Sequence, residues 1–158
     1  MKRVSTPQAP GAVADYSQAT VHNGTVYCAG QIGFTPSTAG GWELATSFED
    51  QTRCALNNLR AVLQAAGTDF NQVLKVGVFL TSMDDYAAFN TLYADFLETV
   101  WREVLGPDSF EVPDDEGTGV RTLGLREHPD VILPARAAVA VAALPKGARV
   151  EVDAIAAL

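Results

Sequence analysis

Two apolar runs near the C-terminus decide the fold that this sequence predicts. The first is Leu133-Pro134-Ala135-Arg136-Ala137-Ala138-Val139-Ala140-Val141-Ala142, and the second is Val150-Glu151-Val152-Asp153-Ala154-Ile155. Because they flank a turn that contains Pro145 and Gly147, they are typical of an antiparallel hairpin. Each run is mostly apolar and should be largely covered, so a charge inside it needs a reason.

Arg136 and Glu151 are the charges with the clearest chemical use. A planar guanidinium grips a carboxylate through two parallel hydrogen bonds, and a nearby glutamate can accept a proton from water. Ordinary edge charges or a salt bridge are the alternatives. The spacing disfavours the salt bridge, because a turn centred near Lys146 separates the two residues by roughly 16 Å at ~3.3 Å per residue. One site containing both requires a bulge or a second subunit, and a subunit interface is the simpler solution.

Short sequence pieces spread over most of the chain carry a family resemblance. They are Ala14-Asp15-Tyr16-Ser17-Gln18, Val26-Tyr27-Cys28-Ala29-Gly30-Gln31-Ile32, Phe89-Asn90-Thr91-Leu92-Tyr93, Pro134-Ala135-Arg136, Leu144-Pro145-Lys146-Gly147 and Val150-Glu151-Val152-Asp153-Ala154-Ile155-Ala156. In this order and spacing they resemble the reactive intermediate deaminase family (RidA/YjgF), also called endoribonuclease L-PSP. The resemblance implies an α+β, chorismate-mutase-like fold: a mixed β-sheet with two helices packed on one face, assembled as a homotrimer with clefts between subunits.

The resemblance also implies a reaction, the hydrolysis of reactive 2-imino acids or enamines to 2-oxo acids and ammonia. Arg136 would hold the substrate carboxylate, and Glu151 would orient and deprotonate water. A protonated imine is already electrophilic, so no metal and no organic cofactor is expected. The remaining substrate-binding residues that the resemblance implies are Tyr16, Gly30, Asn90 and Ala138.

Two alanines depart from the family pattern. Ala29 stands where the family often has serine or threonine, and Ala138 stands where it often has cysteine. Losing a hydroxyl removes one possible substrate hydrogen bond, whereas the backbone carbonyl of Ala138 could still hold the water. The two alanines are therefore expected to change the substrate preference more than the reaction itself. A pathway-specialised hydrolase fits as well as a housekeeping one.

Two other functions stay open. A non-catalytic or regulatory protein that binds small carboxylates would need Arg136 but not Glu151. A ribonuclease is disfavoured, because a net charge of −8 and a pI near 4.6 repel phosphate backbones and no basic stripe compensates. The two histidines, His22 beside a turn and His128 in a predicted loop, are interpreted as solvated rather than catalytic. No nucleic-acid partner is expected.

Composition predicts one RidA-like domain over residues 1–158, because 158 residues that are 47% hydrophobic suffice for one core. No apolar run approaches the length that spans a membrane, and the N-terminus lacks the apolar segment of a signal peptide. A cytoplasmic protein without membrane contact is expected. Cys28 and Cys54 lack metal-ligand spacing and are predicted to be buried free thiols.

Local signals place the remaining elements. Asn23-Gly24 predicts a type I′ hairpin within residues 16–30. A helix is expected from Thr46 or Ser47 to a stop at Gly67, and a strand over Val73–Leu80 follows. A second helix should start around residues 82–85 and carry an apolar stripe that packs in the core. The two helices can cover only one face of the sheet, so the other face should meet a partner or solvent.

The segment from Gly106 to Val131 is the main departure from the family pattern, in which a short loop leads to Pro-Ala-Arg. It contains Pro107, Pro113, Pro129 and an acidic run at 114–116, a composition that does not specify regular structure. The segment is therefore predicted to be an inserted solvated loop that is dispensable for folding. Because it leads directly into the Arg136 strand, it should lie near the mouth of the cleft.

Overall fold

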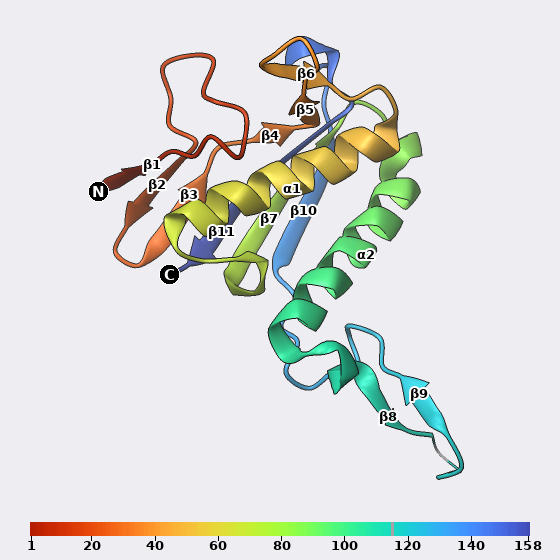
Figure 1. Ribbon diagram of the computed structural model, residues 1–158. Helices are drawn as coiled ribbons and strands as arrows, with labels where there is room; N and C mark the ends of the chain where they lie inside the picture. Colours follow the sequence, from red (N-terminus) through yellow and green to blue (C-terminus); the bar gives the residue numbers. More distant parts are fainter. Residues whose placement is uncertain (115) are drawn as a thin grey trace.

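The computed structural model describes residues 1–114 and 116–158, and within them one mixed sheet is covered by two helices (Figure 1). Helices α1 (Phe48–Ala66) and α2 (Tyr86–Leu105) lie on the same face, as predicted. The strand order is β1-β2-β3-β11-β7-β10, and β4 also pairs with β11. The strand bounds are β1 Lys2–Val4, β2 Ala19–His22, β3 Thr25–Cys28, β4 Gln31–Ile32, β7 Val73–Leu80, β10 Ala135–Ala140 and β11 Val150–Ala157.

Shorter elements connect these parts. Two-stranded sheets are formed by β5 (Phe34–Pro36) with β6 (Trp42–Leu44), and by β8 (Glu111–Pro113) with β9 (Val120–Thr122). The 3₁₀ turns are η1 (Phe70–Gln72), η2 (Met83–Asp85), η3 (Pro107–Phe110) and η4 (Pro145–Gly147). None of the helices in the described part of the chain is long and apolar enough to cross a membrane.

The predicted helix and turn signals are confirmed. Ser47 caps α1 by accepting a hydrogen bond from the Asp50 amide at 3.0 Å, and Gly67 ends the helix with a left-handed φ of 98°. In the β2–β3 hairpin, Asn23 and Gly24 have φ angles of 48° and 72°, the positive values that a type I′ turn requires. These signals were readable because each acts within a few residues of its own position.

The predicted hairpin between the last two apolar runs is wrong. β7 lies between them: β10 pairs with β7 in parallel, and β11 pairs with β7 antiparallel. The parallel pair follows from α2, which forms the crossover between β7 and β10 as in other βαβ units. The turn at Pro145–Gly147 is present, but it carries the chain past the end of β7 instead of closing a two-stranded ribbon.

The two faces of the sheet differ, and β11 shows the difference most clearly. The residues that face the helices are buried: Val150, Val152, Ala154 and Ala156. Their neighbours on the opposite face, Glu151, Asp153 and Ile155, are only half-buried. Strands β3 and β10 extend that face with apolar side chains, since Tyr27 and Val139 are 48% and 47% exposed. One face therefore lacks helical cover within the described chain, as predicted.

The cysteines are free, as predicted, although both are half-buried rather than fully buried. Burial raises the pKa of Cys28 to about 12, with Asp153 adding to the shift. The Cys28 thiol is therefore protonated at neutral pH and a weak nucleophile, which fits a packing role.

The 106–131 segment is more ordered than predicted. The β8–β9 hairpin forms an arm, described over residues 111–114 and 116–122, that projects away from the helices (Figure 1). At the base of the arm, the Phe110 side chain is fully buried and its ring centroid lies 4.6 Å from that of His128. His128 Nε2 donates to the Ser109 carbonyl at 3.1 Å, since Nδ1 already accepts from the Asp130 amide. The solvated interpretation is wrong for His128, whereas His22 is exposed as expected.

Phe110→Ala should lower the free energy of unfolding by about 3–5 kcal/mol, because it empties a fully buried aromatic position. Val120→Ala in the arm should change it by less than about 0.5 kcal/mol, because Val120 is 67% exposed. Denaturant unfolding of both variants measures the difference. If Phe110→Ala changed the free energy of unfolding as little as Val120→Ala, the base of the segment would contribute nothing to folding, as the sequence alone suggested.

Candidate active site

Arg136 projects from β10 toward α2, where three side chains fix its guanidinium. Nη2 donates to Asn90 Oδ1 at 2.7 Å and to the Tyr86 hydroxyl at 3.4 Å. The guanidinium carbon also lies 5.1 Å from the ring centroid of Tyr93, a cation–π distance. The Arg136 side chain thus has a defined orientation without a carboxylate partner among the described residues.

A cavity of about 700 Å³ opens beside this guanidinium and is called the Arg136 pocket. α2 forms one wall, with Tyr86, Asn90 and Tyr93. The remaining lining comes from the turn that follows β9, residues 124–127, and from Leu133–Pro134. The end of the 106–131 segment therefore lines the pocket beside Arg136. Its position at the mouth of a substrate cleft stays a prediction.

Glu151 lies in a second cavity of about 440 Å³, the Glu151 pocket, which also contains Tyr16 and Gly30. β11 pairs with β4 here, with Glu151 opposite Ile32. A side chain at Gly30 would overlap the Glu151 carboxylate and would have to displace it, so glycine lets the glutamate keep this position. The group that lies against the Gly30 backbone is thus the glutamate of the same chain.

The environment of Glu151 favours its protonated form. Burial raises the pKa of Glu151, and repulsion from the Asp153 carboxylate raises it further. Asp153 is two residues along the same face of β11, and its Oδ1 accepts a hydrogen bond from the Gly77 amide at 3.0 Å. Glu151 itself has no hydrogen-bond or ion-pair partner among the described residues, so its carboxyl group is free to handle a proton.

Asp153→Asn should move the acid limb of the rate profile to lower pH. In the native chain the rate of a Glu151-dependent reaction falls as pH drops through the raised pKa, since protonation removes the base. Asparagine can still accept from Gly77, but it removes the repulsion, so the pKa of Glu151 decreases. The measurement is kcat/KM against pH, with Asp95→Asn on the exposed side of α2 as the charge-matched control. An unmoved acid limb would contradict the coupling.

Within one chain, the sheet separates the Arg136 pocket from the Glu151 pocket. Arg136 is opposite Val76 on the helical side of the sheet, whereas Glu151 is opposite Phe79 on the other side. Five of the six predicted site residues therefore divide between the pockets, with Arg136 and Asn90 in one and a second group in the other. The second group is Tyr16, Gly30 and Glu151. Ala138 is half-buried on β10, two residues beyond Arg136, and is not among the lining residues of either pocket.

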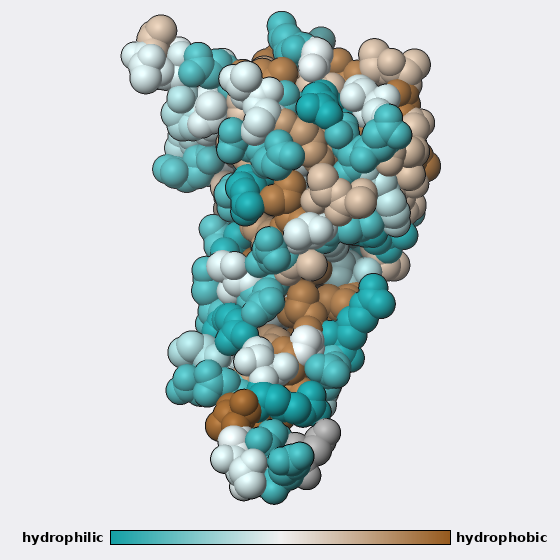
Figure 2. Space-filling model, turned by 90° about the vertical axis from the view of Figure 1, so that its right-hand side faces the viewer, coloured by the Kyte–Doolittle hydropathy of each residue, from teal (hydrophilic) through white to brown (hydrophobic). Residues whose placement is uncertain are grey.

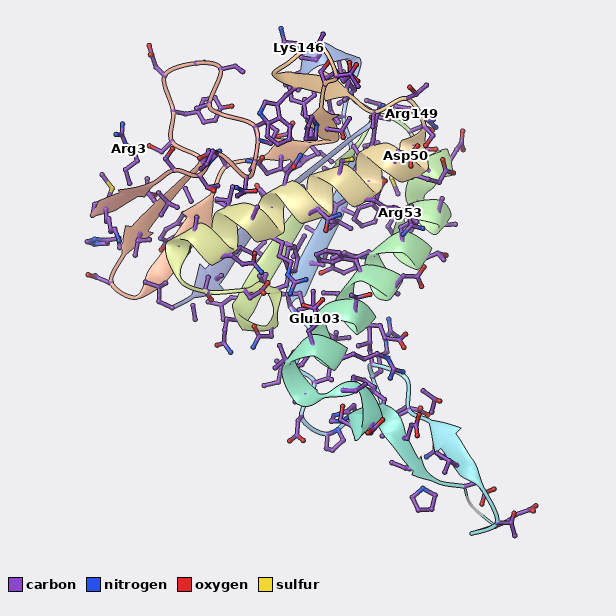
Figure 3. The ribbon with its side chains drawn as sticks, in the orientation of Figure 1. Arg3, Asp50, Arg53, Glu103, Lys146 and Arg149 are labelled. Carbon is purple, nitrogen blue, oxygen red and sulfur yellow. The ribbon has the colours of Figure 1, made fainter. Side chains whose placement is uncertain are left out.

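Several residues at these pockets were missed from the sequence. Tyr86 and Tyr93 contact Arg136 but were unassigned or interpreted only as core. Their spacing with Asn90, at positions i, i+4 and i+7, was the available signal, because it puts all three on one side of α2. Lys146, in the η4 turn at the top of Figure 3, lines the Glu151 pocket with a left-handed φ of 59°.

Comparison with known proteins agrees with this architecture. Residues 6–158 match the family described as Endoribonuclease L-PSP. The chain is 36% identical over 155 residues to 2-iminobutanoate/2-iminopropanoate deaminase of Mus musculus, covering 98% of this chain and 90% of the mouse protein. It is 31% identical over 156 residues to the putative regulator AldR of Lactococcus lactis, covering 99% and 97% of the two chains.

A solved structure extends the comparison to the fold. Escherichia coli TdcF with bound serine matches with a TM-score of 0.74 and 30% identity, covering 100% of this chain and 99% of TdcF. The mixed sheet with two helices on one face is thus the chorismate-mutase-like fold that the resemblance implied. This chain belongs to the endoribonuclease L-PSP (RidA/YjgF) family.

Proposed function

We propose that this protein hydrolyses 2-imino acids, or their enamine tautomers, to 2-oxo acids and ammonia in clefts shared by two copies of the chain. One observation carries the proposal. Each chain presents an oriented arginine without a carboxylate partner and a glutamate without a hydrogen-bond partner, in separate pockets on opposite faces of the sheet. The names of the mouse relative and its mammalian counterparts support the reaction class.

The assembly that joins the halves is proposed to be a homotrimer. A contact that brings the Arg136 pocket of one copy to the Glu151 pocket of the next uses two different surfaces, so it is heterologous and forms a closed assembly when the rotation between copies completes a ring. Three copies is the number that the family resemblance implies. The uncovered sheet face supports the proposal, since its apolar side chains at Tyr27 and Val139 would otherwise face water.

The chemistry in such a cleft needs only these side chains. Arg136 binds the substrate carboxylate through two charge-assisted hydrogen bonds, and Asn90 keeps the guanidinium in place. Glu151 takes a proton from water as the water oxygen bonds to the imine carbon and the C=N electron pair moves to nitrogen. The carbinolamine then collapses: Glu151 returns its proton to the nitrogen, the C–N bond breaks as the hydroxyl oxygen forms the C=O bond and releases its own proton to Glu151, and ammonia and the 2-oxo acid remain. Tyr16 and Gly30 enclose the reacting carbon.

The alternative is a regulatory protein that binds small carboxylates without turnover. The relative named putative regulator AldR and the serine-bound TdcF structure favour keeping it. Such a protein would need Arg136 and could dispense with Glu151. Ribonuclease activity has less support, because neither pocket has a histidine among its described lining residues and the chain carries a net charge of −8.

Ammonia release from freshly generated 2-iminobutanoate tests the reaction. Hydrolysis should be faster with the protein than in matched buffer, without added metal or cofactor, and should saturate with substrate. A rate equal to that in buffer, together with measurable binding of 2-oxobutanoate, would favour the regulatory alternative.

A further inference from the structure

The turn after β9 adds charged side chains, Arg126 and Glu127, to the lining of the Arg136 pocket. The Glu127 amide donates to the Gly124 carbonyl at 2.9 Å, and Glu127 Oε2 accepts from the Gly124 amide at 2.9 Å. The next residue, His128, is buried against Phe110. The turn that carries Arg126 is therefore anchored to the base of the arm. Its hydrogen bonds and the buried His128 beside it hold the Arg126 backbone at the pocket.

The charges that line this pocket do not cancel. Glu98 is engaged by Arg102 at 2.9 Å, and Glu127 lies 3.7 Å from Arg121. Arg126 has no hydrogen-bond or ion-pair partner among the described residues, and Arg136 has no carboxylate partner there either. In a chain of net charge −8, one pocket thus gathers two arginines whose charge is not neutralised by an acidic side chain. Such a pocket attracts anions.

Tyr93 adds a donor that lacks an acceptor. Its side chain is 7% exposed and lines the pocket, and its hydroxyl is buried with no hydrogen-bond partner among the described residues. Burial raises the pKa of Tyr93 to about 12, although Arg136 acts in the opposite direction, so the hydroxyl remains a donor at neutral pH. Because buried polar groups are normally hydrogen-bonded, this hydroxyl indicates a ligand oxygen.

On a single chain, before a second copy closes the proposed cleft, the pocket is also larger than a small imino acid requires. Its volume of about 700 Å³ is in the range of sites that hold drug-sized ligands, whereas 2-iminobutanoate has four carbons. Figure 2, which views the molecule from the α2 side, shows apolar surface exposed between the body and the arm, suited to the methylenes of a longer substrate.

We propose that the Arg136 pocket holds a second acidic group on the substrate side chain, so that the preferred substrates are dicarboxylic 2-imino acids and Arg126 determines this preference. The inference rests on the proposed function in one respect, the binding of the 2-imino carboxylate by Arg136. Arg126 then receives the side-chain carboxylate across the pocket, and the Tyr93 hydroxyl donates to the bound acid.

Calorimetry with two product analogues tests the preference: 2-oxoglutarate, a dicarboxylate, and 2-oxobutanoate, a monocarboxylate. The native protein should bind 2-oxoglutarate about tenfold more tightly, the effect of one charged hydrogen bond at an exposed arginine. Arg126→Gln should reduce that ratio to about one. Tyr93→Phe should weaken binding of the dicarboxylate without removing a charge. Arg3→Gln makes the same charge change on β1, at the edge of the sheet opposite β10, and should keep the ratio (Figure 3).

Equal affinities in the native protein, or an unchanged ratio in Arg126→Gln, would overturn the inference. A ratio that falls equally in Arg3→Gln would assign the effect to net charge and would overturn it too. Neither result bears on Glu151-dependent hydrolysis of 2-iminobutanoate, which is measured separately. Absence of hydrolysis would rule out the proposed function. The role of Arg126 is tested separately, by the ratio of the affinities for 2-oxoglutarate and 2-oxobutanoate.

Discussion

Glu151→Gln should lower single-turnover hydrolysis of 2-iminobutanoate by about 10²–10⁴-fold, the usual contribution of a positioned general base. Glutamine keeps the volume and most of the hydrogen-bonding reach of glutamate, but it cannot take a proton from water. The affinity for 2-oxobutanoate should change by less than about twofold, because the carboxylate is held by Arg136 in the other half of the cleft. Single-turnover ammonia release and calorimetry on the same preparations measure the two quantities.

Glu49→Gln is the matched control, since it makes the same chemical change at an exposed position in the first turn of α1. Its rate and affinity should equal those of the native protein. Equal losses of rate and affinity in Glu151→Gln would recast Glu151 as a structural partner of the pocket. Retention of both would favour the regulatory alternative, with any hydrolysis owed to another group or to water.

Arg136→Ala should abolish measurable binding and turnover of carboxylated substrates. Each charged hydrogen bond to the carboxylate contributes roughly 1.5–3 kcal/mol, so the loss of two exceeds about a hundredfold in affinity. The truncation also leaves Asn90 Oδ1 without its 2.7 Å donor. Lysine should restore little, because its point charge lacks the fork that reaches Asn90 and two carboxylate oxygens together.

The control for this prediction is Arg53→Ala, an exposed arginine on α1 (Figure 3). Melting temperatures of both variants separate a binding defect from unfolding. Unchanged kcat/KM in Arg136→Ala would exclude the residue as the carboxylate anchor, whatever happened to stability.

Local elements of the fold were predictable, and long-range pairing was not. The Ser47 cap, the Gly67 stop and the Asn23-Gly24 turn act on their own neighbours, so the sequence specifies them directly. The last two runs have strand composition and a turn between them, but composition does not say which strand is the partner. β7 enters between them because α2 returns the chain in parallel, a long-range arrangement that a turn signal cannot reveal.

The sequence predicted which residues belong to the candidate site, but it did not predict how they are arranged in space. Arg136 with Asn90, and Glu151 with Tyr16 and Gly30, do gather as two groups. Their separation depends on which side of each strand faces the helices, and this requires the sheet register. The packed base of the arm was missed because prolines and acidic residues dominate the segment, while only Phe110 and His128 are buried among its described residues.

The central claim is that Arg136 of one copy and Glu151 of another complete each active site, and mixing two inactive variants tests it most directly. Arg136→Ala and Glu151→Gln chains, unfolded together and refolded at equal concentrations, should regain hydrolysis of 2-iminobutanoate. Random assembly of a ring gives about a quarter of the clefts one native arginine and one native glutamate. Activity should therefore recover to about a quarter of that of refolded native protein. No recovery above that of either variant refolded alone, with trimers present by light scattering, would contradict the shared cleft.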